Sequence, residues 1–166
     1  MAKSKILVVG GTGCIGKWTV KASLAQRHTT YVLQRQEIGL DIDKVLVLLS
    51  FKEQGALLVE ASFSDHQSLV DVFVCAMSGS FYRSHNILLQ LKLVDDIKEA
   101  GNTKPSEFGM DPARMGDALE PGRITFDEKM IARKTIEEAK IPFTYICGSC
   151  FAGYFVGNLS LMGTLV

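Results

Sequence analysis

A short apolar run that ends at a cluster of glycines is the feature that most constrains this fold. Residues 5–9, Lys-Ile-Leu-Val-Val, lead directly into Gly10-Gly-Thr-Gly-Cys-Ile-Gly16, and a helix-compatible stretch follows from about Gly16 to Gln26. A continuous apolar run of this length, bounded by glycine, is typical of a strand buried on both faces of a parallel sheet. The sequence therefore predicts a buried strand, a tight loop and a helix in direct succession.

Strands and helices then alternate along the chain. This alternation predicts an α/β fold with a Rossmann-like, doubly wound parallel sheet, in a single domain over residues 1–166. The pattern indicates further strands at 29–33, 56–61, 72–77 and 143–146, and helices at about 41–54, 84–100 and 126–140.

Two places do not fit this alternation. Residues 62–71 are too few for a parallel crossover, which needs about a dozen residues including its helix, so the helix there should be cut short. Residues 102–106, Asn-Thr-Lys-Pro-Ser, offer no apolar run and place a proline where a central strand could not use it. One internal strand is therefore expected to be missing. Residues 151–166 are strongly apolar, an unusual end for a globular domain.

The glycine cluster has a chemical meaning in this setting. Glycine lets the backbone turn tightly and approach a pyrophosphate, whose charge the free N–H groups of the following helix can bind. We therefore expect a dinucleotide at this loop, and the alternative is a purely structural strand-to-helix turn. The cofactor-binding residues expected here are Gly10, Gly11, Thr12, Gly13, Cys14, Ile15 and Gly16.

The residue expected to contact the adenosine ribose lies about 20 residues after the motif, at the end of the second strand. Proteins that prefer NAD place an acid there, whereas this chain has Arg35. A guanidinium suits a 2′-phosphate, and Lys44 at the head of the next helix could add a second charge. The pattern favours NADPH as the cofactor. A solvated surface arginine is the alternative, and Glu37 nearby weakens the case.

A lysine lies on the apolar side of the 126–140 helix. Thr125-Phe-Asp-Glu128 has capping-box spacing, which predicts that Lys129 lies in the first turn or so. Lys129 then shares a face with Ala132, Ile136 and Ala139. The helix dipole, partial burial and Arg133 would disfavour its charged form and help it accept a proton, while Asp127 and Glu128 act in the opposite sense. A structural lysine with an exposed amine is the alternative.

Composition excludes several classes of protein. The 166 residues carry no net charge, which argues against a nucleic-acid or membrane-surface partner. Four cysteines lie mostly within apolar runs, and no signal peptide is recognisable, so reduced thiols in the cytoplasm are expected. Cys147-Gly-Ser-Cys150 resembles a redox motif, but a strand end is the better interpretation. The three histidines lack metal-ligand spacing, and no metal is expected.

Five segments together resemble a known family. They are Gly10-Gly-Thr-Gly-Cys-Ile-Gly16, Tyr31-Val-Leu-Gln-Arg35, Ser64-Asp-His-Gln-Ser-Leu-Val70, Pro105-Ser-Glu-Phe-Gly-Met-Asp-Pro112 and Phe151-Ala-Gly-Tyr-Phe155. The combination resembles the plant isoflavone reductase-like group of atypical short-chain dehydrogenases, within the NmrA-like superfamily, and especially its pinoresinol-lariciresinol reductase branch. The resemblance covers the whole chain but only the N-terminal half or so of a family member.

The resemblance implies NADPH-dependent reduction of benzylic ether bonds in lignans. It assigns Lys129 to phenol deprotonation, after which the ether ring opens to a quinone methide that receives hydride. Arg35 and Lys44 match the 2′-phosphate contacts, and Ser78, Ser149 and Phe151 match positions beside the cofactor. Family members have Asn at the position of Ser149, more residues near Val70, an apolar strand before Pro105, and a C-terminal half that closes the substrate pocket. The chain is therefore expected to be an incomplete copy.

Two classes of function follow. The first is an NADPH-dependent lignan reductase, inactive if the missing parts are essential, with a lignan as its small-molecule partner. The second is a non-enzymatic NADP-binding protein that contacts a protein partner. Lys129 favours the enzyme, and the absent C-terminal half favours the alternative. A homodimer is among the expected assemblies.

Overall fold

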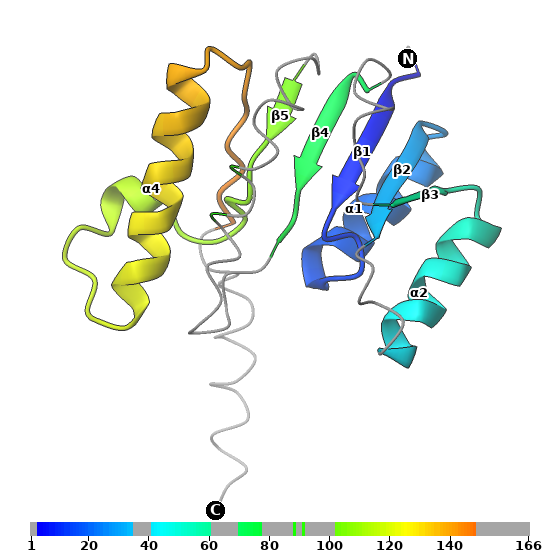
Figure 1. The fold of residues 1–166 in the computed structure, drawn as a ribbon, viewed down its shortest axis with the longest axis horizontal. Coiled ribbons are helices and arrows are strands. Elements are labelled where there is room, and N and C mark those ends of the chain that lie inside the picture. Colours follow the sequence, from blue (N-terminus) through cyan, green and yellow to red (C-terminus); the bar gives the residue numbers. More distant parts are fainter. Residues whose placement is uncertain are drawn as a thin grey trace, which may run out of the picture.

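The structure, a computed structural model, describes residues 3–34, 41–60, 70–77, 88, 91 and 102–148. Within these ranges five strands form one parallel sheet in the order β3-β2-β1-β4-β5 (Figure 1). The predicted parallel α/β fold is confirmed. The strands are β1 (Lys5–Val9), β2 (Thr29–Gln34), β3 (Leu57–Glu60), β4 (Val72–Cys75) and β5 (Asn102–Lys104).

The first strand lies in the middle of the sheet. Val8 of β1 is in register with Val32 of β2 on one side and with Val74 of β4 on the other. The chain thus adds strands outwards from β1 in both directions, first β2 and β3, then β4 and β5. This doubly wound order places a topological switch point between β1 and β4, at whose carboxyl ends ligands of such folds bind.

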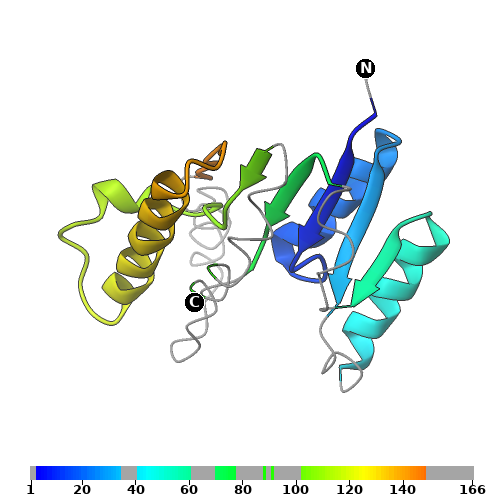
Figure 2. The ribbon, with the colours of Figure 1, turned by 45° about the horizontal axis from the view of Figure 1, so that its top comes forward.

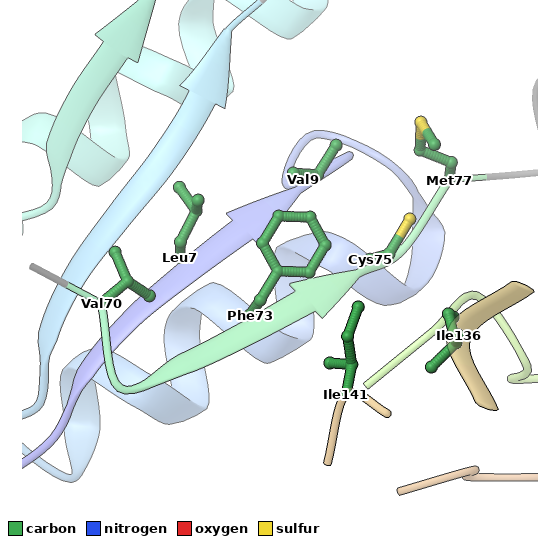
Figure 3. Close-up of a cluster of buried hydrophobic side chains, with 8 residues drawn as sticks. All are labelled: Leu7, Val9, Val70, Phe73, Cys75, Met77, Ile136 and Ile141. Carbon is green, nitrogen blue, oxygen red and sulfur yellow. The ribbon is translucent and has the colours of Figure 1, made fainter. Parts of the chain in front are cut away.

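The described helices pack against one face and one end of the sheet. Helices α1 (Cys14–Ala25) and α2 (Ile42–Glu53) cover one face, and α4 (Gly122–Glu138) lies beside β5, at the opposite end of the sheet from α2 (Figure 2). The core beneath α1 and α2 comprises Val8, Val20, Val32, Leu48, Phe51, Ala56 and Val74. The core on the other face comprises Leu7, Val9, Val70, Phe73, Cys75, Met77, Ile136 and Ile141 (Figure 3).

The expectation of a missing strand after residue 101 is wrong. Residues 102–104 form β5, in which Thr103 is in register with Phe73 of β4. The backbone N–H of Thr103 also donates to the carbonyl of Pro142 at 2.8 Å, and its carbonyl accepts from Thr144 at 2.9 Å. Backbone hydrogen bonds on both sides, rather than an apolar run, hold this strand, which ends just before Pro105.

The strand expected at 143–146 is reduced to a single bridge between Phe143 and Thr103. Phe143 and Ile146 are exposed, so these residues lack the burial that an inner strand needs. The short crossover at 62–71 falls largely outside the described residues, as do most of the 84–100 helix and all of 151–166.

The helix expected to begin near Phe126 begins a turn earlier, at Gly122. Pro121 occupies the N-cap, and Arg123 pairs with Asp127 one turn later at 3.5 Å. These residues extend the helix through Thr125, so the expected capping box at Thr125–Glu128 does not form its start. Lys129 therefore lies in the second turn, and the expectation of a first-turn position is wrong.

The core makes a direct prediction for Phe73, which is fully buried between the sheet and α4 (Figure 3). Phe73→Ala should lower the free energy of unfolding by about 3–5 kcal/mol, because it removes a large buried ring and leaves a cavity. Urea unfolding followed by circular dichroism measures the change. Leu119→Ala, at a side chain 86% exposed, is the control and should change the free energy by less than about 0.5 kcal/mol. Equal effects of the two substitutions would contradict this description of the core.

Candidate functional site

The glycine loop packs backbone against backbone at the carboxyl ends of β1 and β4. Gly10 has φ +79°, and a Cβ atom built on it would lie 2.7 Å from the carbonyl oxygen of Ala76. A Cβ atom on Gly16 would lie 2.7 Å from the carbonyl carbon of Gly10. Any larger residue at either position would collide with main-chain atoms. The two glycines thus let α1 begin directly at the edge of the sheet.

The start of α1 has the chemistry of an anion site. Gly13 is its N-cap, contributes no side-chain hydrogen bond, and is followed by no acidic residue in the first turn. The first helical hydrogen bond runs from the N–H of Lys17 to the carbonyl of Gly13 at 3.0 Å. The N–H groups of Cys14, Ile15 and Gly16 precede it and carry the positive end of the helix dipole. The start of α1 thus presents main-chain N–H groups and no acidic side chain, which is the chemistry that suits a pyrophosphate.

Contacts at the end of β4 connect this loop to the next segment. The N–H of Ala76 donates to the carbonyl of Val9 at 2.8 Å, which holds β4 beside the end of β1. The hydroxyl of Ser106 donates to the carbonyl of Met77. The segment after β5 therefore lies against the same carboxyl edge as the glycine loop.

The expected 2′-phosphate contacts are only partly described. Lys44 lies in the first turn of α2, where its backbone N–H and its Nζ both donate to the carboxylate of Asp41, the N-cap residue. The side-chain hydrogen bond from Lys44 lowers the pKa of Asp41 below its usual value. The Lys44 side chain is half-exposed, and its amine is paired with the N-cap of its own helix. Arg35, Ser78, Ser149 and Phe151 lie outside the described residues.

Lys129 lies on the buried side of α4, as expected. Its side chain is 9% exposed, and Ala132 and Ile136 on the same side are buried with it. A methyl group built on Gly109 would lie 3.6 Å from Nζ of Lys129. The amine thus lies next to the main chain of the segment after β5. Because Lys129 is in the second turn, the dipole at the helix N-terminus, which falls off within the first turn, acts on it only weakly.

A buried ion-pair cluster one turn further along α4 is not foreseen from the sequence. Arg133 binds Glu107 through two hydrogen bonds, Nε to Oε1 and Nη2 to Oε2, both at 3.1 Å. Its Nη1 donates to Asp111 at 2.9 Å. Its guanidinium also lies over the ring of Tyr145, 4.3 Å from the centroid, and 3.8 Å from Sγ of Cys147. Arg133 is therefore not an unpaired cation that repels Lys129.

Burial and pairing shift the pKa values of Arg133, Tyr145 and Cys75. Burial lowers the pKa of Arg133, but hydrogen bonds and charge from Glu107 and then Asp111 outweigh it and raise that pKa. Burial, followed by a hydrogen bond to Glu137, raises the pKa of Tyr145. Burial raises the pKa of Cys75 to about 12, so this thiol stays protonated and is not a nucleophile at neutral pH.

The described residues contain neither a membrane-spanning helix nor a cluster of metal ligands. No helix there is long and apolar enough to cross a membrane. In the same ranges, no three His, Cys, Asp or Glu side chains lie close enough together to bind a metal ion.

Comparison with known proteins identifies the family. The NmrA-like family model matches residues 2–165. The chain belongs to the NmrA-like family. Among curated relatives, it is 68% identical to an isoflavone reductase homolog of Lupinus albus and 64% identical to a bifunctional pinoresinol-lariciresinol reductase of Sinopodophyllum hexandrum. Each match covers 100% of this chain and 56% of the relative.

Solved structures of related proteins share this fold. The chain is similar to AtPrR2, solved with NADP+ and (+)pinoresinol, with a TM-score of 0.85 and 59% identity over 96% of this chain and 54% of the other. The Rossmann-like fold is thereby confirmed. The chain spans about half the length of the curated relatives that it matches. Alignments of 175 positions against 166 residues also show that these relatives have residues that this chain lacks within the matched range.

The close packing of the glycine loop makes a testable prediction. Gly16→Ala should lower the free energy of unfolding by about 1–3 kcal/mol, because the new Cβ would overlap the main chain at Gly10 and must displace it. Thermal or urea unfolding measures the effect. Gly116→Ala is the matched control, since a Cβ there meets no atom within 4 Å. If both alanine variants were equally stable, the loop would not be packed as described.

Proposed function

We propose that this chain is a single NADP-binding domain that acts in the NADPH-dependent reduction of benzylic ether bonds in lignans of the pinoresinol type. One observation carries the proposal: a series of contacts along the carboxyl edge of the sheet links the glycine loop to the buried lysine. Gly10 packs on the end of β4, Ser106 binds the carbonyl of Met77 there, and Gly109 lies beside Nζ of Lys129. An anion-binding loop and a buried amine thus border one carboxyl edge of the sheet.

The glycine loop supplies the binding site for the cofactor in this proposal. The N–H groups at the start of α1 would hold the pyrophosphate, with Gly10, Gly11, Thr12, Gly13, Cys14, Ile15 and Gly16 lining it. Arg35 and Lys44 would together bind the 2′-phosphate. Ser78, Ser149 and Phe151 are assigned to the cofactor on the family resemblance. When bound, NADPH would supply a hydride to the substrate.

Lys129 is proposed as the general base. Its neutral amine would take the proton from the phenol of the lignan, and the electron pair released into the ring would expel the benzylic ether oxygen. Burial on α4 removes competing water from the amine, and the adjacent main chain at Gly109 limits where the substrate phenol can approach. The relatives named above, which include a pinoresinol-lariciresinol reductase and AtPrR2 with bound (+)pinoresinol, support this substrate class. A cytoplasmic location and a homodimeric state are further parts of the proposal.

Arg35 should determine the choice of cofactor. Arg35→Ala should weaken NADPH binding about 10- to 100-fold and leave NADH binding unchanged, since a charge-assisted bond to phosphate contributes about 1.5–3 kcal/mol. Fluorescence titration with the two nucleotides gives both dissociation constants. Lys52→Ala, an exposed change at the far end of α2, is the control. Equal affinities of the unmutated protein for NADPH and NADH would refute the proposed selectivity.

Lys129 should affect turnover rather than binding. Lys129→Ala should leave the dissociation constant of NADPH nearly unchanged and lower kcat for pinoresinol about 100-fold or more, the usual scale for a positioned acid-base group. Chromatography of the lignan products measures turnover. Lys134→Ala, at an exposed lysine of the same helix, should be neutral. Normal turnover by Lys129→Ala would make the lysine structural, and tight NADPH binding with no turnover by the unmutated protein would instead support a non-enzymatic NADP-binding role.

A further inference from the structure

Arg133 joins three separate parts of the chain around one guanidinium. It belongs to α4, its fork binds Glu107 through both carboxylate oxygens, and a third nitrogen binds Asp111. Its flat face covers the ring of Tyr145, in the segment that follows α4. A guanidinium is suited to this task because its donors lie in one rigid plane, whereas an ammonium cannot bind two carboxylates and a ring in the same geometry.

The pair with Glu107 is buried. The Glu107 side chain is 2% exposed and that of Arg133 is 12% exposed. Two charges removed from water in this way are held in place strongly, because separating them would leave an uncompensated charge in the interior. The segment that carries Glu107 is therefore fixed to α4 at this point.

The residue held between the two carboxylates is the one that faces the lysine. Gly109 lies two residues after Glu107 and two before Asp111, and a methyl group on it would be 3.6 Å from Nζ of Lys129. Lys129 and Arg133 are four residues apart, so they lie one above the other on the same side of α4. The carbonyl of Gly109 also accepts a hydrogen bond from the N–H of Gly148 at 2.9 Å. The main chain beside the amine is thus held on both sides.

We propose that Arg133 is a positioning residue for Lys129: by binding Glu107 and Asp111 it fixes the main chain at Gly109 against the amine and so determines where Nζ lies. The link to catalysis rests on the function proposed above for Lys129. The positioning itself involves neither substrate nor cofactor, so it can be tested without them.

The test compares how fast Lys129 and Lys134 of the same helix react with a low dose of acetic anhydride, read by peptide mass spectrometry. Lys134 is exposed and serves as the internal reference. In the whole protein, Arg133→Lys keeps the positive charge but loses the two-pronged bond, so the Lys129 to Lys134 labelling ratio should rise severalfold. Arg123→Lys, which changes an exposed ion pair on the same helix, is the matched control and should leave the ratio unchanged.

A second variant covers the case in which Arg133→Lys does not fold. Asp111→Ala removes one tether, at the exposed end of the cluster, and leaves the buried pair between Arg133 and Glu107 in place. It should raise the labelling ratio by a smaller factor with little change in thermal stability. An unchanged ratio in each variant that folds overturns the proposal.

Steady-state kinetics distinguish a positioning role of Arg133 from a purely structural one. Arg133→Lys should lower kcat for pinoresinol about 10- to 100-fold through misplacement of the lysine, while the KM and the dissociation constant of NADPH stay near their normal values. A parallel loss of NADPH affinity and kcat would indicate general loosening and would contradict positioning. Raised labelling in a protein that turns over no lignan would support the positioning of Lys129 and refute the proposed function alone.

Discussion

Direct contact between main-chain atoms at Gly10 and Gly16 is the constraint on which the arrangement of this site depends. Because neither residue has a side chain, the first turn of α1 sits on the ends of β1 and β4 with nothing in between. The same closeness seats Gly11 over Val20 and Val32, so the loop and the core beneath α1 are packed as one unit. A loop that binds an anion through its N–H groups benefits from this rigidity. Donors that are already oriented lose little conformational entropy when the anion binds.

The other half of the site is held by charge rather than by close packing. Taking Glu107 and Arg133 out of water is costly, and a buried ion pair adds little net stability compared with apolar residues of the same size. What such a pair does provide is a single allowed geometry, because any other arrangement leaves a buried charge without its partner. The two halves meet at the end of β4, where Ser106 reaches the carbonyl of Met77.

Local patterns in the sequence predict most of the sheet but not its last strand. Apolar runs identify β1 and β4, and helical spacing correctly places Ala132 and Ile136 on the buried side of α4. Strand β5 cannot be predicted from local patterns, because it is held by backbone hydrogen bonds to two neighbouring segments. Such bonds leave no pattern of side chains in the sequence. The ion pair between Glu107 and Arg133 cannot be predicted in this way either, because 26 residues separate the partners and no periodicity links them. The glycine loop is recognisable because its function imposes a spacing on consecutive residues.

The central position of β1 has a consequence for how the protein is made. A chain leaves the ribosome from its N-terminus, so the middle strand of this sheet emerges first and its outer strands later. β2 can pair with it early, but its other neighbour, β4, begins only at Val72. Until then one full edge of an apolar strand has no partner, and such edges are where chains join wrongly to one another. Between the synthesis of Val9 and that of Val72, the free edge of β1 is thus exposed to pairing with strands of other chains. This is the period in which the nascent protein is most prone to aggregate.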